Sequence, residues 1–151
     1  MGNPYHVAIL ELSRRGAIAG FEDGTFRPAM LVTRQQFAKM IVKTLGYPVT
    51  PVGTSPFADV SIYGSPSDPL YPAGYIAVCA ARGITTGKKP GLFAPYDTVS
   101  RGQLITMVSR AAGLTDPSGL WDGLPGMGSA SFVPVSRGEV AMMLYSNLLH
   151  K

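Results

Sequence analysis

The sequence contains a single cysteine, Cys79, and this scarcity excludes two common ways of stabilising a small protein. One cysteine cannot close an intramolecular disulfide, and without partner cysteines it cannot build a zinc or iron–sulfur site of the cysteine-rich kind. Its neighbours Val78 and Ala80 are apolar, so we interpret Cys79 as a small buried hydrophobic residue. The fold must therefore be held together by packing.

Long apolar runs are also missing. No stretch approaches the roughly 18 consecutive apolar residues of a membrane helix, so we predict no membrane span. The stretch from Met1 to Pro4 lacks a basic region followed by a hydrophobic one, so an intact signal peptide is absent from this segment. A segment excised from a secreted protein would look the same, and the absence therefore does not assign the chain to the cytoplasm.

Catalytic motifs are scarce. The two histidines, His6 and His150, lie at opposite ends of the chain, and neither has a glutamate at metal-binding spacing. There is no nucleophile elbow, no phosphate-binding glycine loop and no recognisable carboxylate pair for glycoside hydrolysis. The string Glu22-Asp23-Gly24 lacks the alternating oxygen ligands of a calcium loop and is interpreted as a turn. We expect a binding protein that is not an enzyme and uses no cofactor or metal.

Charge of either sign is sparse. The 13 lysines and arginines exceed the 9 acidic residues and give a formal net charge of +4, which favours an anionic partner. These basic residues form no run, and the stretch from Phe37 to Leu45 carries only Lys39 and Lys43, so it is not a basic recognition helix. We therefore expect no nucleic-acid partner.

What the chain does contain is an internal repeat. Shifting the sequence by 67 residues aligns Gly16 with Gly83, and the match continues without a gap over about 30 residues. A further shift of 36 residues carries Ser100-Arg101-Gly102-Gln103 onto Ser136-Arg137-Gly138-Glu139. We therefore divide a single domain of residues 1–151 into three copies, at 5–47, 57–114 and, in degenerate form, 115–151.

Each copy contains a helix whose start is marked by a capping box. Three hydroxyl residues are suitable N-caps, and a Gln or Glu follows each of them at the third position. These pairs are Thr33 with Gln36, Ser100 with Gln103, and Ser136 with Glu139. Apolar residues then follow the spacing of one buried helix face. They are Phe37, Met40, Ile41 and Leu45, then Leu104, Met107, Val108, Ala111 and Ala112, then Val140, Met143, Leu144 and Leu148.

A shorter apolar helix precedes the capped helix in the first two copies, at 5–15 and 75–82, and a turn-rich loop joins the two helices of each copy. The third copy shows no obvious first helix. Residues 115–131, which include Trp121, are rich in Gly, Pro and Ser and stand in its place. Either the third lobe is degenerate, or its missing helix comes from a neighbouring chain or from sequence outside this segment.

Several strings together resemble a known family. They run from Arg15 to Pro28, from Val32 to Phe37 and from Arg82 to Gly87, and include the opening motif Phe57-Ala58-Asp59-Val60, in which we interpret Asp59 as a cap or turn residue. These strings resemble the S-layer homology repeats of bacterial cell-surface proteins. The resemblance implies an all-α fold of helix–loop–helix repeats in a pseudo-threefold, three-lobed arrangement. It also implies a secreted, cell-surface module that anchors non-covalently by binding secondary cell-wall polysaccharide, often pyruvylated.

The chain departs from the family pattern in each copy. The first copy lacks the opening motif, and the third lacks a recognisable first helix. The second inserts residues 61–72 and carries Lys88-Lys89-Pro90-Gly91 where the first copy has an Asp-Gly turn. These departures keep a second interpretation open, a structural or assembly module that binds protein or self-associates, with a homo-oligomer completing the third copy.

An arginine directly follows the N-cap in all three copies. Arg34, Arg101 and Arg137 start beside a helix N-terminus, whose amides and dipole favour an anion, and a guanidinium is a planar, bidentate donor matched to a carboxylate. A pyruvate ketal presents such a carboxylate, and the resemblance implies that these arginines hold it. The alternative is a structural ion pair or simple packing of the side-chain stem.

The remaining candidates for ligand binding have equally plain alternatives. Thr33, Ser100 and Ser136 are interpreted first as caps. Lys88 is either a contact to an anionic glycan or the solvated tip of a loop. Trp121 either stacks on a sugar face or closes a small core.

Overall fold

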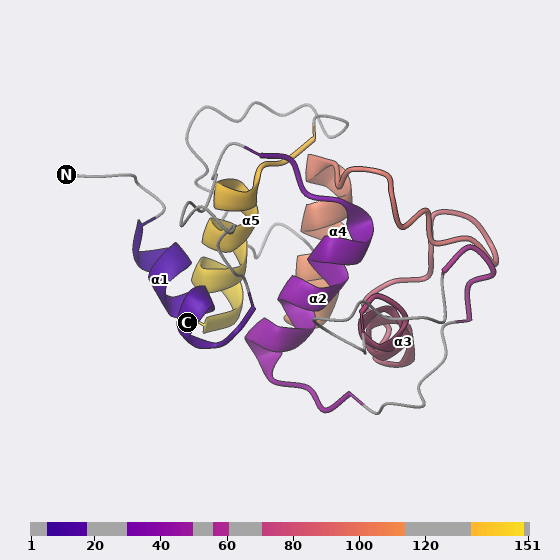
Figure 1. The fold of residues 1–151 in the computed structure, drawn as a ribbon, viewed down its shortest axis with the longest axis horizontal. Coiled ribbons are helices and arrows are strands. Elements are labelled where there is room, and N and C mark those ends of the chain that lie inside the picture. Colours follow the sequence, from indigo (N-terminus) through magenta and orange to yellow (C-terminus); the bar gives the residue numbers. More distant parts are fainter. Residues whose placement is uncertain (1–5, 18–29, 50–55, 61–70, 114–133, 150–151) are drawn as a thin grey trace.

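The computed structural model describes residues 6–17, 30–49, 56–60, 71–113 and 134–149. Within these ranges the chain forms helices joined by turns and isolated β-bridges, without an extended sheet (Figure 1). The elements are α1 (His6–Arg14), α2 (Arg34–Leu45), α3 (Ala73–Ala81), α4 (Arg101–Ala111), α5 (Arg137–Leu144) and a π-helical turn, η2 (Tyr145–Leu149). The predicted all-α class is confirmed.

The three capped helices begin where the sequence predicts. In α2, the Thr33 Oγ1 accepts the Gln36 amide at 3.3 Å, and the Gln36 side chain accepts the Thr33 amide at 2.9 Å. The same reciprocal pair opens α4 and α5. Such a cap stabilises a helix by about 1 kcal/mol. At its other end α2 stops at Gly46, which adopts the left-handed conformation (φ 71°) that glycine accepts without strain.

A closed ring of backbone hydrogen bonds joins the three copies. The Val32 amide donates to the Val135 carbonyl (3.3 Å), the Val135 amide to the Val99 carbonyl (2.9 Å), and the Val99 amide to the Val32 carbonyl (2.8 Å). The three valines occupy equivalent positions of the repeat, just before the caps, and all are fully buried. A cycle of three like contacts requires an approximate threefold axis, so the predicted pseudo-threefold arrangement is confirmed.

The hydrophobic core includes residues of α2, α4 and α5, and α5 contacts both of the other two helices (Figure 1). The apolar positions predicted from spacing face this core, and equivalent residues of the three copies are buried together. They are Phe37, Leu104 and Val140, then Met40, Met107 and Met143, then Ile41, Val108 and Leu144. Cys79 is fully buried as well, which confirms its interpretation as a hydrophobic residue.

The first helix of one copy packs on the second helix of another. The second copy's α3 contacts α2 of the first copy, and the first copy's α1 contacts α5 and η2 of the third. The chain therefore closes on itself, and α5 is covered by a helix of the same chain. Residues 115–131 and Trp121, where the sequence offers no first helix for the third copy, lie outside the described residues.

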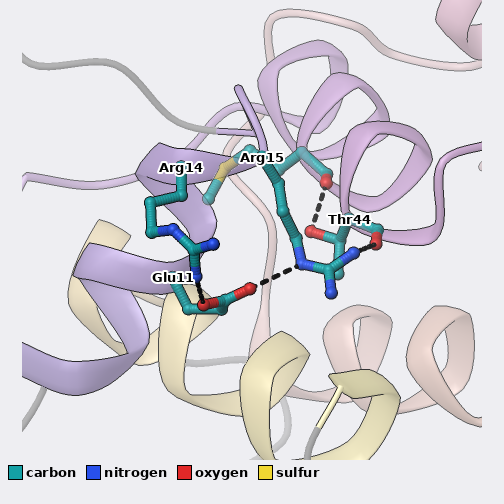
Figure 2. A network of polar contacts seen from close by, with 5 residues as sticks. Glu11, Arg14, Arg15 and Thr44 are labelled. Atoms are coloured by element: carbon teal, nitrogen blue, oxygen red, sulfur yellow. Dashed lines mark hydrogen bonds and ion pairs between the residues drawn. The ribbon is translucent and has the colours of Figure 1, made fainter.

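A polar contact also ties α1 to α2. The Arg15 Nε donates to Glu11 Oε2 at 3.0 Å, and the Arg15 Nη1 donates to the carbonyl of Thr44 at 3.5 Å, near the end of α2. Figure 2 shows the guanidinium spanning the two helices, with Arg14 bound to the other oxygen of Glu11 at 2.6 Å. The residue that follows α1 thus makes one long polar contact to α2, while α1 itself packs on α5.

Candidate ligand-binding groove

A surface cavity of about 390 Å³ lies between the first and second copies. Arg34 at the start of α2, the residues that follow α3 and one face of α4 surround it. The lining consists of Arg34, Thr85, Thr86, Gly87, Lys88, Gly102, Gln103, Thr106, Met107 and Arg110. Three of these side chains are positively charged and none is acidic, so the cavity, which we call the cationic groove, favours an anionic group.

The loop that carries Lys88 to the groove is shaped by two glycines. The Thr85 hydroxyl accepts the amide of Gly87 at 3.1 Å, and Gly87 has a φ of 91°. A Cβ at Gly87 would lie 2.5 Å from Cε1 of Phe57 and 2.6 Å from the Leu92 carbonyl oxygen, so only glycine fits. Further along, Gly91 (φ 78°) follows Pro90 in a tight turn closed by the Leu92 amide, the pattern of a type II turn.

Arg34 is almost entirely buried, with 3% of its surface exposed. Its Nε donates to the carbonyl of Phe93 at 2.6 Å, and its guanidinium carbon lies 4.6 Å from the centre of the Phe93 ring. Burial lowers the pKa of Arg34, while the charges of Asp97 and Asp59 act in the opposite direction. Arg34 is thus a fixed cation in the wall of the groove, and only a small part of it is accessible.

The amides at the start of α2 already have acceptors. The Arg34 amide donates to the carbonyl of Asp97 (2.8 Å), the Gln35 amide to the carbonyl of Pro95 (3.1 Å), and the Gln36 amide to the Thr33 cap. At α5, the Arg137 amide likewise donates to the carbonyl of Met30 at 2.8 Å. The backbone amides that the sequence suggested as anion donors are therefore occupied by contacts within the protein. An anionic ligand must be attracted by side chains instead.

The threefold arrangement separates the other two arginines from Arg34. Arg101 at the start of α4 is 9% exposed, and Arg137 at the start of α5 is half-buried, which lowers its pKa. Neither lines the cationic groove. Thr33, Ser100 and Ser136 each accept the N3 amide as caps. Of the residues predicted to bind ligand, the groove therefore brings together Arg34 and Lys88.

Sequence reasoning missed the contribution of α4. Gln103, Thr106, Met107 and Arg110 follow helical i, i+3, i+4, i+7 spacing, so they share one face of the helix. The sequence did show that Gln103, Thr106 and Arg110 form a polar stripe along this side of the helix, beside the buried apolar positions. The Arg110 Nη1 also donates to the carbonyl of Ile84 at 3.4 Å, next to the loop that completes the groove.

A second depression of about 380 Å³ adjoins the groove and shares Lys88 and Gln103 with it. Its other lining residues are Asp97, Thr98, Ser100 and Pro134. The Lys88 Nζ pairs with Asp97 Oδ2 at 2.5 Å, and this contact lowers the pKa of Asp97. Both side chains are about half exposed, so the pair lies at the surface between the two depressions.

Comparison with known families identifies the repeats. The model of the S-layer homology domain matches residues 5–38 and 64–105, which together make up half of the chain. The chain belongs to the S-layer homology domain family. The matched segments lie in the first two copies. Helix α5 has the same capping box as α2 and α4, and Val135 completes the valine ring. The assignment of residues 115–151 to a degenerate third copy stays a prediction.

Similar proteins are far longer than this chain. It is 34% identical over 105 residues (68% of the chain) to an endoglucanase of Bacillus sp. strain KSM-635, and 28% identical over 115 residues (75%) to a surface layer protein of Brevibacillus choshinensis. It is also 28% identical over 96 residues (62%) to cell surface glycoprotein 1 of Acetivibrio thermocellus. The matched parts span 4% to 10% of these relatives.

The family match and the relatives both indicate a module of bacterial cell-surface proteins, because two of the three relatives are named as cell-surface or surface layer proteins. In the described part of the S-layer homology domain, every helix is too short or too polar to span a bilayer.

Proposed function

We propose that this S-layer homology domain anchors a larger protein non-covalently to the bacterial cell wall. It does so by binding an acidic, pyruvylated secondary cell-wall polysaccharide in the cationic groove. The observation that carries the proposal is the lining of the groove, where Arg34, Lys88 and Arg110 meet from two copies and no acidic side chain lines the cavity, although Asp97 beside it pairs with Lys88. The volume of about 390 Å³ lies within the range of small-ligand sites.

The three cations play different parts. Arg34 lies in the wall, away from bulk water, where its interaction with a carboxylate is screened less than at the surface. Lys88 and Arg110 are exposed and meet the ligand from opposite sides, one from the loop and one from α4. The hydroxyls of Thr86 and Thr106 and the amide of Gln103 offer hydrogen bonds to sugar hydroxyls.

Lys88 is held by Asp97, and the ligand must compete for it. A half-exposed ion pair contributes about 0–1 kcal/mol, so a ligand carboxylate can replace Asp97 at little cost. The predicted roles of the remaining residues in ligand binding stay predictions; these residues are Arg101, Arg137, Thr33, Ser100, Ser136 and Trp121.

Calorimetric titration tests the proposal directly. The domain is titrated with purified pyruvylated cell-wall polysaccharide, before and after mild acid removal of the ketal. We expect Arg110→Ala to weaken binding by up to about fivefold, because a charged contact at this exposed position contributes up to about 1 kcal/mol. The matched control is Arg14→Ala, which removes the same charge from an exposed position on α1, outside the groove.

Two results would count against the proposal. Failure of the folded wild-type domain to bind either form of the polymer would remove the glycan-binding role. Equal losses in Arg110→Ala and Arg14→Ala would show that net charge, and not the groove, attracts the polymer.

A further inference from the structure

Asp59 makes a contact that the sequence did not reveal. It belongs to the opening motif of the second copy and does not line the cationic groove. Its Oδ1 accepts the amide of Phe93 at 2.9 Å, and its Oδ2 accepts the amide of Ala94 at 2.8 Å. One carboxylate thus holds two consecutive amides of a segment more than 30 positions further along the chain.

The backbone that Asp59 holds is unusual. Ala94 has a φ of 61°, in the left-handed region that side chains other than glycine rarely adopt. Two charge-assisted hydrogen bonds compensate for this conformation, because both are made by an ionised acceptor. The ring of Phe57, two positions before Asp59, packs against the ring of Phe93, and their centres are 5.4 Å apart.

The segment fixed in this way is also the one that holds Arg34. The Phe93 carbonyl accepts the Arg34 Nε, and the Phe93 ring lies beneath the guanidinium. A turn of the Phe93–Ala94 backbone would move both the acceptor and the ring at once. The orientation of the buried cation therefore depends on the Asp59 carboxylate, two contacts away.

We propose that Asp59 is a positioning residue of the cationic groove, which orients the Arg34 guanidinium toward an anionic ligand through the backbone of Phe93 and Ala94. This inference rests on the proposed function, in which the groove binds the carboxylate of a pyruvylated glycan. It assigns the opening motif of one copy to the arginine of the preceding copy, so the site is shared between copies.

The sign of the effect separates positioning from simple electrostatics. Removal of a negative charge near a cationic groove strengthens the binding of an anion if only the field matters. If Asp59 positions Arg34, Asp59→Asn weakens binding instead, because an amide side chain cannot accept both backbone hydrogen bonds through two oxygens. We expect a loss of at least tenfold in affinity for the pyruvylated polysaccharide.

The matched control is Asp97→Asn. Asp97 also acts electrostatically on Arg34, but its carboxylate pairs with Lys88 and not with the Phe93 and Ala94 amides. We expect unchanged or tighter binding in this variant. A tenfold loss in Asp97→Asn, or tighter binding in Asp59→Asn, would overturn the proposal.

A ligand-free measurement separates this inference from the proposed function. In a ¹⁵N-labelled protein, the Arg34 Nε–H gives a side-chain NMR signal that the Phe93 ring shifts and that the hydrogen bond protects from solvent exchange. We expect Asp59→Asn to move this signal and accelerate its exchange, and Asp97→Asn to preserve both. An unchanged Arg34 signal in Asp59→Asn refutes positioning, whereas a wild-type domain that binds no polysaccharide refutes only the function.

A second variant guards against simple unfolding. Ala94→Gly removes the unfavourable left-handed alanine, so the double variant Asp59→Asn with Ala94→Gly regains loop stability, which thermal melting checks. If Asp59 positions Arg34, the double variant folds but binds weakly and keeps the displaced Arg34 signal. Recovery of both affinity and signal would show that the carboxylate serves the loop alone.

Discussion

Replacement of Gly87 by alanine tests the shape of the groove loop. Two terms add in this variant. A left-handed backbone conformation costs a residue with a Cβ about 1–2 kcal/mol, and overpacking costs about 1–3 kcal/mol. The second term applies because the new methyl would lie 2.6 Å from the Leu92 carbonyl oxygen, which the Lys88 amide holds in place at 2.9 Å. We therefore expect a loss of about 2–5 kcal/mol in the free energy of unfolding.

Gly91→Ala supplies the control for this prediction. Gly91 also has a positive φ (78°), but a Cβ there meets no atom within 4 Å, so only the conformational term of about 1–2 kcal/mol applies. Urea unfolding followed by circular dichroism measures the free energy of unfolding of both variants, and thermal unfolding measures their Tm. For a chain of this length the expected fall in Tm is about 4–20 °C for Gly87→Ala and about 2–8 °C for Gly91→Ala. Equal losses in the two variants would refute the close approach as the reason for Gly87.

Three further predictions follow from individual contacts. Burial raises the pKa of Cys79 to about 12, so we expect the native thiol to resist iodoacetamide at pH 8 and to react at once in denaturant; fast native alkylation would contradict its burial. Thr33→Ala should lower the free energy of unfolding by about 1 kcal/mol through loss of the α2 cap, and Gln35→Ala, which leaves the capping box intact, should lower it by less in the same urea titration. The contacts with Arg15 and Arg14 lower the pKa of Glu11, so the stability that they give the fold is present above the ordinary carboxyl range and is lost as the pH falls through the folded pKa. Glu11→Gln should therefore be less stable than wild type at pH 7 and equal to it at low pH. A difference in stability that persists in acid would contradict this.

Local patterns accounted for the helices. A capping box needs only two residues three positions apart, and a buried face needs only regular apolar spacing, so Thr33 with Gln36 and the row that starts at Phe37 could be predicted from the chain alone. The 67-residue shift then implied equivalent positions in the other copies. The helix preceding α4 was predicted at 75–82 and lies at Ala73–Ala81, because Pro72 is compatible with a helix start and apolar residues follow it directly.

The groove depended on contacts that no local pattern encodes. Asp59 and Phe93 are 34 positions apart, and Arg34 and Phe93 are 59 apart, so their hydrogen bonds follow from how the copies assemble. The same assembly occupies the amides of Arg34 and Arg137, which an isolated helix would leave open. The sequence therefore indicated which residue types form the groove. Which of these residues lie close together depends on how the copies assemble.

The packing of α1 on α5 has a mechanical consequence. Helix α1 contacts α5 and η2, and it reaches α2 through Arg15. The ring formed by Val32, Val99 and Val135 is fully buried. We therefore expect a pull applied to α1 to separate this helix from α5 before it opens the ring.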